Sequence, residues 1–221
     1  MLKEIEDEFG RYELGLMVNT GWHQDPKRLA FTLSRYKFVA KMLAGRKSVL
    51  EIGCGDGFAS RIVAAEVEHL TLSDVDPIFI DEVRKHPIPE SAKIDTVVAD
   101  FVAAPLPGPF DGIYGLDVLE HIQPADENAF MSNLCASLAD DGAVIVGLPS
   151  LESQAYASPG SKAGHVNCKS GDQLKEFLSR YFANVFVFSM NDEVVHTGYF
   201  PMAQYLLALS TQKKAGGGGG G

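Results

Sequence analysis

The sequence lacks the cysteine pairs, basic clusters and long apolar runs that mark several large classes of protein. Its three cysteines, Cys54, Cys135 and Cys168, form no Cys-x-x-Cys pair, which argues against a disulfide framework or a zinc site and favours a reducing cytoplasm. Acidic residues outnumber basic ones, 29 to 19, for a net charge of −10, and an acidic surface disfavours nucleic acid as a partner. No apolar run approaches the roughly 20 residues of a membrane span, and residues 1–8 are too acidic for a signal peptide.

The most informative stretch is a short apolar run that ends in an acid, Glu51, and is followed by glycines at alternate positions, Gly53, Gly55 and Gly57. An apolar run bounded by glycine predicts a buried strand, and the glycines allow a sharp turn and a close approach of the backbone to a ligand. The N–H groups that open the next predicted helix favour an electron-rich ligand group. A dinucleotide fingerprint requires Gly-x-Gly-x-x-Gly, and Phe58 stands where its third glycine belongs. An NAD site is therefore disfavoured.

Predicted strands and helices alternate along most of the chain. The 221 residues, 46% of them hydrophobic, suffice for one domain with an additional segment. Strands are predicted over 49–52, 69–74, 94–99, 110–116, 143–149, 185–188 and 199–209. Helices are predicted within 2–18 and over 26–44, 59–65, 78–85, 130–138 and 174–181, with a polar stretch at 19–25, a turn at 140–142 and a long loop at 150–170. Such alternation indicates a parallel sheet with helices on both faces.

Acidic residues follow the first three predicted strands. Glu51 comes at the end of the first strand, Asp74 ends the second, and Asp100 follows the third. Because the carboxyl ends of parallel strands meet at one edge of the sheet, these carboxylates are expected to surround one crevice. Asp74 follows Gly57 at close to the interval expected for a carboxylate that binds ribose hydroxyls. A helix cap is the alternative for Asp74, although Asp76 is better placed for the cap.

Two segments resemble motifs of the class I S-adenosylmethionine (SAM) dependent methyltransferases. One is the acid Glu51 followed by Gly-x-Gly-x-Gly, and the other is Leu119-Glu120-His121 after the fourth strand. The resemblance is clear over residues 49–148. It implies a doubly wound, Rossmann-like α/β fold, in which three α/β/α layers contain a seven-stranded, mostly parallel sheet with an antiparallel last strand. The chain then divides into an N-terminal helical lid segment (1–44), a SAM-binding methyltransferase domain (45–212) and a tail (213–221) whose six glycines cannot pack.

The resemblance implies which residues contact the cofactor. In the family the glycine loop passes beneath the methionine part of SAM, the acid before it helps to fix the loop and the amino group, and the acid after the second strand binds the ribose. The next residue packs on adenine, and the acid after the third strand, with the following backbone N–H, binds the polar edge of that ring. These positions and three neighbours are Glu51, Gly53, Cys54, Gly55, Gly57, Asp74, Val75, Asp100, Phe101, Leu116 and Tyr36. A core aromatic residue is the alternative for Tyr36.

Two histidines are candidate catalytic residues. Methylation of a hydroxyl benefits from a general base, and histidine titrates in the right range. His165 lies on the long loop, and His121 belongs to the Leu-Glu-His segment; a structural or solvent-facing role is the alternative for each. A Mg²⁺ site would need several carboxylates near the acceptor. Asp117 and Glu120 are available, but the family motif already accounts for them, so no metal is expected.

The expected function is transfer of a methyl group from SAM to a small molecule, with S-adenosylhomocysteine (SAH) as the second product. A hydroxyl is favoured over an amine as the acceptor, and the acidic net charge and short insertions favour a small acceptor. Three alternatives stay open: an aminopropyl transferase that uses decarboxylated SAM, a non-catalytic SAM-binding module and an NAD-dependent dehydrogenase, against which Phe58 argues. Either a monomer or a homodimer is expected.

Overall fold

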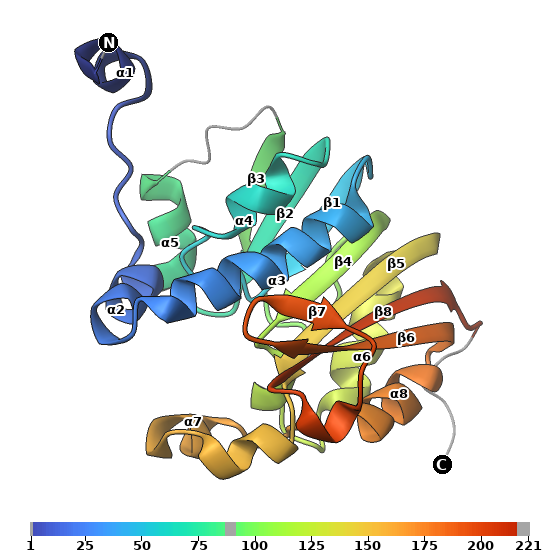
Figure 1. The fold of residues 1–221 in the computed structure, drawn as a ribbon. Coiled ribbons are helices and arrows are strands. Elements are labelled where there is room, and N and C mark those ends of the chain that lie inside the picture. The colour runs from blue at the N-terminus through green and yellow to red at the C-terminus, as the bar shows by residue number, and fades with distance from the viewer. Residues whose placement is uncertain (1, 87–91, 216–221) are drawn as a thin grey trace.

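Eight strands form one sheet, in the order β3-β2-β1-β4-β5-β8-β6-β7, in the computed structural model, which describes residues 2–86 and 92–215 (Figure 1). Strands β1 to β5 run parallel to one another, β8 lies antiparallel between β5 and β6, and β7 forms an antiparallel edge. The carboxyl ends of the first five strands therefore meet at one edge of the sheet. The strands are β1 (Ser48–Ile52), β2 (His69–Asp74), β3 (Lys93–Val98), β4 (Phe110–Leu116), β5 (Leu138–Pro149), β6 (Phe182–Asn191), β7 (Val194–His196) and β8 (Tyr205–Lys213).

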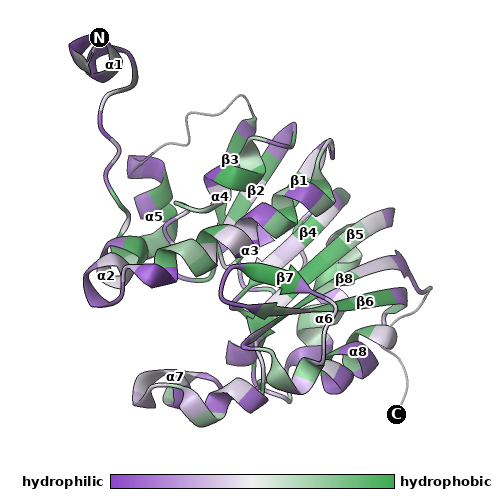
Figure 2. Cartoon of the chain, viewed as in Figure 1, coloured by the Kyte–Doolittle hydropathy of each residue, from purple (hydrophilic) through white to green (hydrophobic). Residues whose placement is uncertain are grey.

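Helices cover both faces of the sheet and give the molecule three layers. The helices of the described residues are α1 (Leu2–Phe9), α2 (Leu16–Gln24), α3 (Lys27–Leu43), α4 (Ser60–Ala64), α5 (Pro77–Lys85), α6 (Glu127–Ser137), α7 (Pro159–Gly164) and α8 (Gly171–Ser179), with the 3-10 turns η1 (Leu119–His121), η2 (Glu152–Tyr156) and η3 (Phe200–Met202). One core lies between the sheet and α3, α4 and α5, and a second lies between the opposite face and α6 and α8. The central strands are hydrophobic along most of their length (Figure 2), because both of their faces are covered.

Local sequence signals explain where two of the covering helices begin. Asp76 accepts a hydrogen bond from the backbone N of Ile78 (2.9 Å), and Pro77 occupies the first turn, so α5 starts where a capping residue and a proline coincide. Helix α8 starts with a capping box, in which the side chains of Ser170 and Gln173 each bond to the other residue's backbone N–H. The cap expected at Asp76 is confirmed.

The predicted fold class is confirmed, with eight strands instead of seven. The additional strand is β7, which forms a hairpin with the end of β6 through a turn at Asp192 and Glu193. Three residues are too few to show the alternation on which a strand prediction depends. The antiparallel strand expected at the end of the chain is β8, which lies between β5 and β6.

Three local predictions were wrong. The predicted loop at 150–170 contains η2 and α7, which are too short to show the apolar periodicity that predicts a helix. The polar stretch at 19–25, for which no element was predicted, lies mostly in α2. The strand predicted over 199–209 starts only at Tyr205, after η3. The predicted turn at 140–142 lies within β5, at an irregularity in its pairing with β4, because residues 139–142 lie between the paired positions Leu138 and Ala143.

The N-terminal helices differ in how they join the rest of the molecule. Helix α1 stands apart from the sheet at the end of an extended connection, whereas α2 lies beside the start of α3 (Figure 1). Of the three N-terminal helices, only α2 and α3 are therefore in a position to shape a site at the sheet edge.

Among residues 2–86 and 92–215, no helix combines the length and the hydropathy that crossing a membrane requires.

Strand β8 continues to Lys213, the first residue of the predicted tail, and this side chain closes the end of α6. Its Nζ donates to the carbonyl oxygens of Cys135 (3.1 Å) and Leu138 (2.7 Å) and lies 3.3 Å from a carboxylate oxygen of Asp140. Carbonyl groups at the end of a helix have no partner within that helix, so a charged donor there is stabilising. The glycines of the predicted tail, 216–221, lie outside the described residues.

We expect Lys213→Met to lower the free energy of unfolding by about 1–2 kcal/mol, because two carbonyl oxygens lose their charged donor. Urea unfolding followed by circular dichroism measures the change. Lys175→Met, at an exposed position of α8, is the control and should change the free energy by less than about 0.5 kcal/mol. Equal effects of the two substitutions would contradict the role given to Lys213.

Candidate functional site

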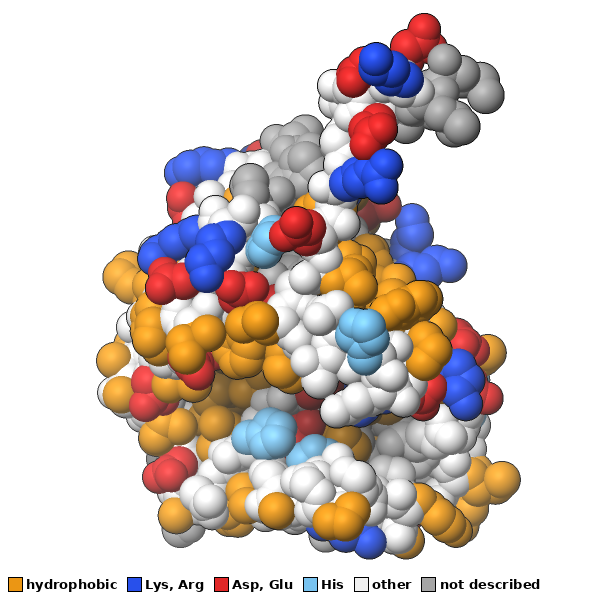
Figure 3. Space-filling model, turned by 90° about the vertical axis from the view of Figure 1, so that its left-hand side faces the viewer, with side chains coloured by type: hydrophobic (Ala, Val, Ile, Leu, Met, Phe, Trp, Pro, Cys, Tyr) orange, Lys and Arg blue, Asp and Glu red, His pale blue; other side chains and the backbone are white. Residues whose placement is uncertain are grey.

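A cavity of about 1140 Å³ opens at the carboxyl ends of the parallel strands. Its walls come from the ends of β1, β2 and β4, from η1, from α2 and α3, and from the segment that contains η2 and α7. Figure 3 shows a hollow with hydrophobic side chains around it and with acidic and histidine side chains inside it. Small-molecule and cofactor sites commonly occupy about 300–1,000 Å³, so this cavity has room for a cofactor together with a second small molecule.

The loop between β1 and α4 turns on three glycines in the left-handed region. Gly53, Gly55 and Gly57 have φ angles of +73°, +54° and +70°, which other residues adopt only at a cost. A Cβ on Gly53 would collide with Val118, and one on Gly57 would lie 2.8 Å from Val83. A Cβ on Gly55 would meet nothing within 4 Å. Gly55 therefore leaves the loop open toward the cavity, while the other two glycines allow it to pack against the protein.

Glu51, near the end of β1, lies behind this loop. It is 1% exposed, and its two carboxylate oxygens accept hydrogen bonds from Tyr36 Oη (2.7 Å) and Tyr114 Oη (2.6 Å). The tyrosines belong to α3 and β4, so one carboxylate joins three elements beneath the loop. Burial raises the pKa of Glu51 to about 7, and the hydrogen bonds from Tyr114 and Tyr36 oppose that rise.

Asp74, at the end of β2, is held by two backbone N–H groups. Its Oδ2 accepts from Gly55 (3.0 Å) and its Oδ1 from Asp76 (3.0 Å), so the carboxylate ties the glycine loop to the turn after β2. A carboxylate has about four lone-pair positions, and Asp74 lines the cavity. The carboxylate therefore keeps the capacity to accept further hydrogen bonds from a ligand.

Three further residues form the cavity wall next to Asp74. Val75 is 65% exposed and offers apolar surface, and Phe101 is buried beneath the wall. The exposed carboxylate of Asp100 accepts from the backbone N of Val102 (2.8 Å). Apolar surface beside a carboxylate suits a flat heterocycle with a polar edge.

The glycine loop also holds the N-terminal helices. The buried carboxylate of Asp56 accepts hydrogen bonds from the backbone N of Val18 (2.9 Å), in the first turn of α2, and of Phe58 (3.2 Å). A loop side chain thus caps a helix that comes earlier in the chain. A Cβ at Gly15, just before α2, would collide with Asp56. This close contact makes α2 part of the cavity wall.

A charged pair joins α3 to the end of β4. Nη1 of Arg35 donates to both carboxylate oxygens of Asp117 (2.9 and 3.2 Å), and the guanidinium group lies 3.7 Å from the centre of the Tyr205 ring. Asp117 has a φ of +57°, an uncommon conformation for a residue other than glycine that is concentrated at functional sites. The pair brings α3, β4 and β8 together in the cavity.

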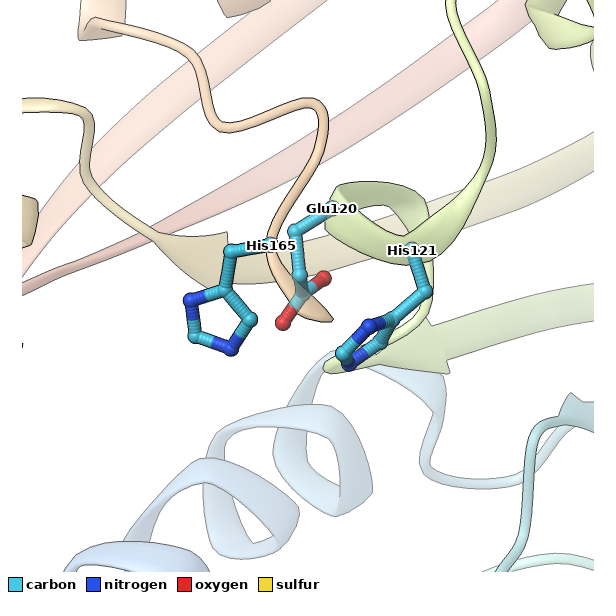
Figure 4. A group of neighbouring side chains, drawn as sticks. All are labelled: Glu120, His121 and His165. Atoms are coloured by element: carbon cyan, nitrogen blue, oxygen red, sulfur yellow. The ribbon is translucent and has the colours of Figure 1, made fainter. Parts of the chain in front are cut away.

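Glu120, His121 and His165 form a cluster where η1 meets the segment after α7 (Figure 4). Glu120 is fully buried, and neither of its carboxylate oxygens has a hydrogen-bond partner among the described residues. Burial raises the pKa of Glu120 to about 9, and the charge of Asp117 adds to the rise. Figure 4 shows the Glu120 carboxylate between the two imidazole rings, whose centres are 5.3 Å apart.

Carbonyl oxygens orient both imidazole rings. Nδ1 of His121 lies 2.9 Å from the backbone oxygen of Gly164, and Nδ1 of His165 lies 2.9 Å from Oε1 of Gln154. Because a carbonyl oxygen only accepts hydrogen bonds, we assign the ring hydrogen to each Nδ1, which leaves each Nε2 of the neutral rings with a lone pair. Burial and the neighbouring His121 lower the pKa of His165, which favours its neutral form.

The structure brings most of the predicted site residues to one cavity. The residues that line it are Tyr36, Gly53, Cys54, Gly55, Asp74, Val75, Asp100, Phe101, Leu116, His121 and His165. Glu51 and Gly57 are placed behind the loop and support it. The sequence did not indicate the contacts of Arg35, Asp56 and Gln154, since each joins segments distant in the chain and has no local signature. Tyr36 was the one predicted site residue in α3.

Known methyltransferases are similar to this chain in sequence. A family model described as a methyltransferase domain matches residues 22–184. A ubiquinone biosynthesis O-methyltransferase of Xylella fastidiosa (strain 9a5c) is 31% identical over 132 residues, which cover 56% of this chain and 52% of that protein. The chain therefore spans about half the length of the relatives that it matches.

Solved methyltransferase structures share the fold. A TehB-like SAM-dependent methyltransferase from Corynebacterium glutamicum has a TM-score of 0.61 at 20% identity, covering 88% of this chain and 97% of that one. The N-methyltransferase NodS from Bradyrhizobium japonicum WM9, in complex with SAH, has a TM-score of 0.58 at 18% identity, covering 86% of this chain and 87% of that one. At these identities the likeness establishes the fold.

We expect Tyr36→Phe to destabilise the fold more strongly at high pH than at low pH. In the wild type the Tyr36 hydroxyl stabilises the ionised form of Glu51. Its removal therefore raises the pKa of Glu51, which burial already raises to about 7, still further. When the pKa of a carboxyl group is higher in the folded than in the unfolded state, the free energy of unfolding falls as pH rises. The loss should be about 1 kcal/mol near about pH 5, where the carboxyl is protonated, and roughly 2–3 kcal/mol near about pH 8.5.

Denaturant unfolding across this pH range measures the difference between variant and wild type. Tyr199→Phe, at a tyrosine that is 72% exposed, is the matched control and should show no pH-dependent loss. A loss that is constant across the pH range would exclude ionisation of Glu51 as its cause.

Proposed function

The chain belongs to the methyltransferase-domain family, and we propose that it transfers a methyl group from SAM to a hydroxyl group of a small molecule. The resemblance of its motifs to class I SAM-dependent methyltransferases is confirmed by the family match over residues 22–184. One observation supports the proposal most. A single cavity contains a left-handed glycine loop, two carboxylates that follow strands, and two imidazoles with free lone pairs.

The residues around the glycine loop suit SAM as the cofactor. Gly55 leaves room for close approach of the methionine part to the backbone. Asp74 keeps acceptor capacity for the ribose hydroxyls, Val75 offers apolar surface to adenine, and Asp100 offers an acceptor to its amino group. When bound, SAM supplies a methyl group on a positively charged sulfur.

The imidazole pair suits a hydroxyl as the acceptor. The Nε2 atoms of His121 and His165 can take the proton that the hydroxyl loses when its oxygen is methylated, and the bonds at Nδ1 hold both rings in place. The Xylella relative is named an O-methyltransferase, which also favours oxygen. We assign α2, α3 and the segment with η2 and α7 as the cover that excludes water from the reacting groups.

Product analysis tests the reaction. The protein is incubated with SAM and a panel of small phenols, alcohols and amines, and SAH is quantified. SAH formed with a phenol or an alcohol supports the proposal. Methylthioadenosine as the product would indicate an aminopropyl transferase, and tight SAM binding without turnover would indicate a non-catalytic module. Either result, or preferential binding of NAD, would overturn it.

We expect Asp74→Ala to weaken SAM binding by about 1–3 kcal/mol, roughly 5- to 150-fold, because the ribose hydroxyls and Gly55 N lose their acceptor. Isothermal titration calorimetry measures the affinity. Asp81→Ala, at an exposed position of α5, should bind SAM as the wild type does. Unchanged affinity in Asp74→Ala would remove this carboxylate from the cofactor site.

We expect His165→Ala to lower the turnover number by roughly 10²–10⁴-fold, the usual contribution of a positioned acid–base group, and to leave SAM affinity near wild type. The measurement is SAH release with an acceptor found in the panel. His69→Ala, at the opposite end of β2, is the control and should retain turnover. A His165→Ala variant as active as wild type would return His165 to a structural role.

A further inference from the structure

Glu120 is a buried carboxylate without a partner. It is 0% exposed, and no described residue donates a hydrogen bond to either oxygen. Arg35 acts on Glu120 electrostatically, but its Nη1 is directed to Asp117, which takes up its charge. A buried carboxylate is costly unless it is paired or binds a cation. The surroundings of Glu120 therefore have a place for a further positive charge.

The two imidazoles beside Glu120 are arranged as metal ligands are. One ligand atom from each of Glu120, His121 and His165 can be chosen so that all three lie within 4.8 Å of one another. Histidines that bind metals usually donate their other ring N–H to a carbonyl or carboxylate oxygen. His121 and His165 both do so through Nδ1, to Gly164 and Gln154. Both Nε2 lone pairs are thereby left for an ion.

We propose that Glu120, His121 and His165 bind a divalent transition-metal ion of the class of Zn²⁺, Co²⁺ or Fe²⁺. Two imidazole nitrogens and one carboxylate are a ligand set of catalytic zinc sites and of two-histidine, one-carboxylate iron sites. Mg²⁺ and Ca²⁺ prefer oxygen ligands and suit this set less well. Three protein ligands leave at least one coordination position, which opens to the cavity that all three residues line.

Backbone contacts hold the three ligands near one another. The carbonyl oxygen of Glu120 accepts hydrogen bonds from the backbone N of Val166 (2.9 Å) and of Asn167 (3.0 Å), so the residues after His165 are fixed to η1. The Asn167 side chain adds a bond to the carbonyl oxygen of Ile122 (3.1 Å). Ligand atoms on one ion lie roughly 3 Å apart, so the side chains need only rotate inward by about 1–2 Å.

The site has a consequence for the acceptor that rests on the proposed function. An ion with an open position would bind the oxygen of the acceptor and lower the pKa of its hydroxyl, so that the hydroxyl could pass its proton to water before the oxygen is methylated. His121 and His165 would then act as ligands and not as proton acceptors. Metal binding itself does not depend on the proposed function, and it is measured without SAM or acceptor.

The test uses the full chain, free of any affinity tag and stripped of metal. Co²⁺ is titrated and followed by its visible absorption, and Zn²⁺ binding is measured by calorimetry. One ion per chain is expected. Glu120→Gln, which keeps the shape but removes the charge, and His165→Ala should each weaken binding by at least about 100-fold, and Gln154→Ala, which removes an outer partner, by about 10-fold.

A histidine outside the cluster provides the control. His23→Ala, at an exposed position of α2, should bind Co²⁺ and Zn²⁺ as the wild type does. Thermal melting of the metal-free variants shows whether they fold, and His121→Ala, at an exposed residue, replaces Glu120→Gln if that variant does not.

The proposal is overturned if neither Co²⁺ nor Zn²⁺ binds, if the cluster substitutions leave binding unchanged, or if Mg²⁺ binds in preference to both. A wild-type protein that binds SAM but no metal would overturn this proposal alone. A protein that binds metal but not SAM would overturn the proposed function alone.

Discussion

The buried carboxylate of Glu51 is the contact on which the cavity depends. It accepts hydrogen bonds from the hydroxyl groups of Tyr36 in α3 and Tyr114 in β4, directly behind the glycine loop. Burying a carboxylate without such donors costs folding free energy. The fold is therefore stable only if α3 and β4 keep their tyrosines next to Glu51 of β1. The backbone groups of Gly53 and Cys54 both donate to the carbonyl oxygen of Ser73 on β2, which holds the loop against the next strand. The same hydrogen bonds therefore stabilise the fold and fix the geometry of the site.

The cavity has two chemically different parts, and this difference fits a reaction between two ligands. Around Gly55 and Asp74 it offers open backbone and carboxylate oxygens, without a described cation in hydrogen-bond contact with Asp74. Around Glu120 it offers two oriented imidazoles and a carboxylate that lacks a partner. The ion pair of Arg35 with Asp117 adds two charges that cancel, so it gives rigidity to the wall with little net field.

Much of the fold followed from short-range patterns. Alternating apolar runs and amphipathic helices predicted the parallel part of the sheet, because β1, β2, β4 and β5 are largely buried and three of the four connections between β1 and β5 contain a helix. The same patterns missed η2 and α7 and gave no prediction for residues 19–25, most of which lie in α2. Helix α2 is capped by Asp56 from the glycine loop, and no feature of residues 19–25 could reveal that partner. Strand β7 was missed because its three residues show no period.

The sequence by itself determined the alternation of strands and helices in the cofactor half, the sharp turn at its glycines and the acids after its strands, since these depend on neighbours in the chain. Only the tertiary structure decided that Glu51 supports the loop from behind and that Asp74 faces the cavity. It alone brought His165 to Glu120, across more than forty positions of chain, through backbone bonds between Glu120 and Val166. Burial and the lack of a partner, which give Glu120 its chemistry, are properties of packing, and packing joins residues that no local pattern connects.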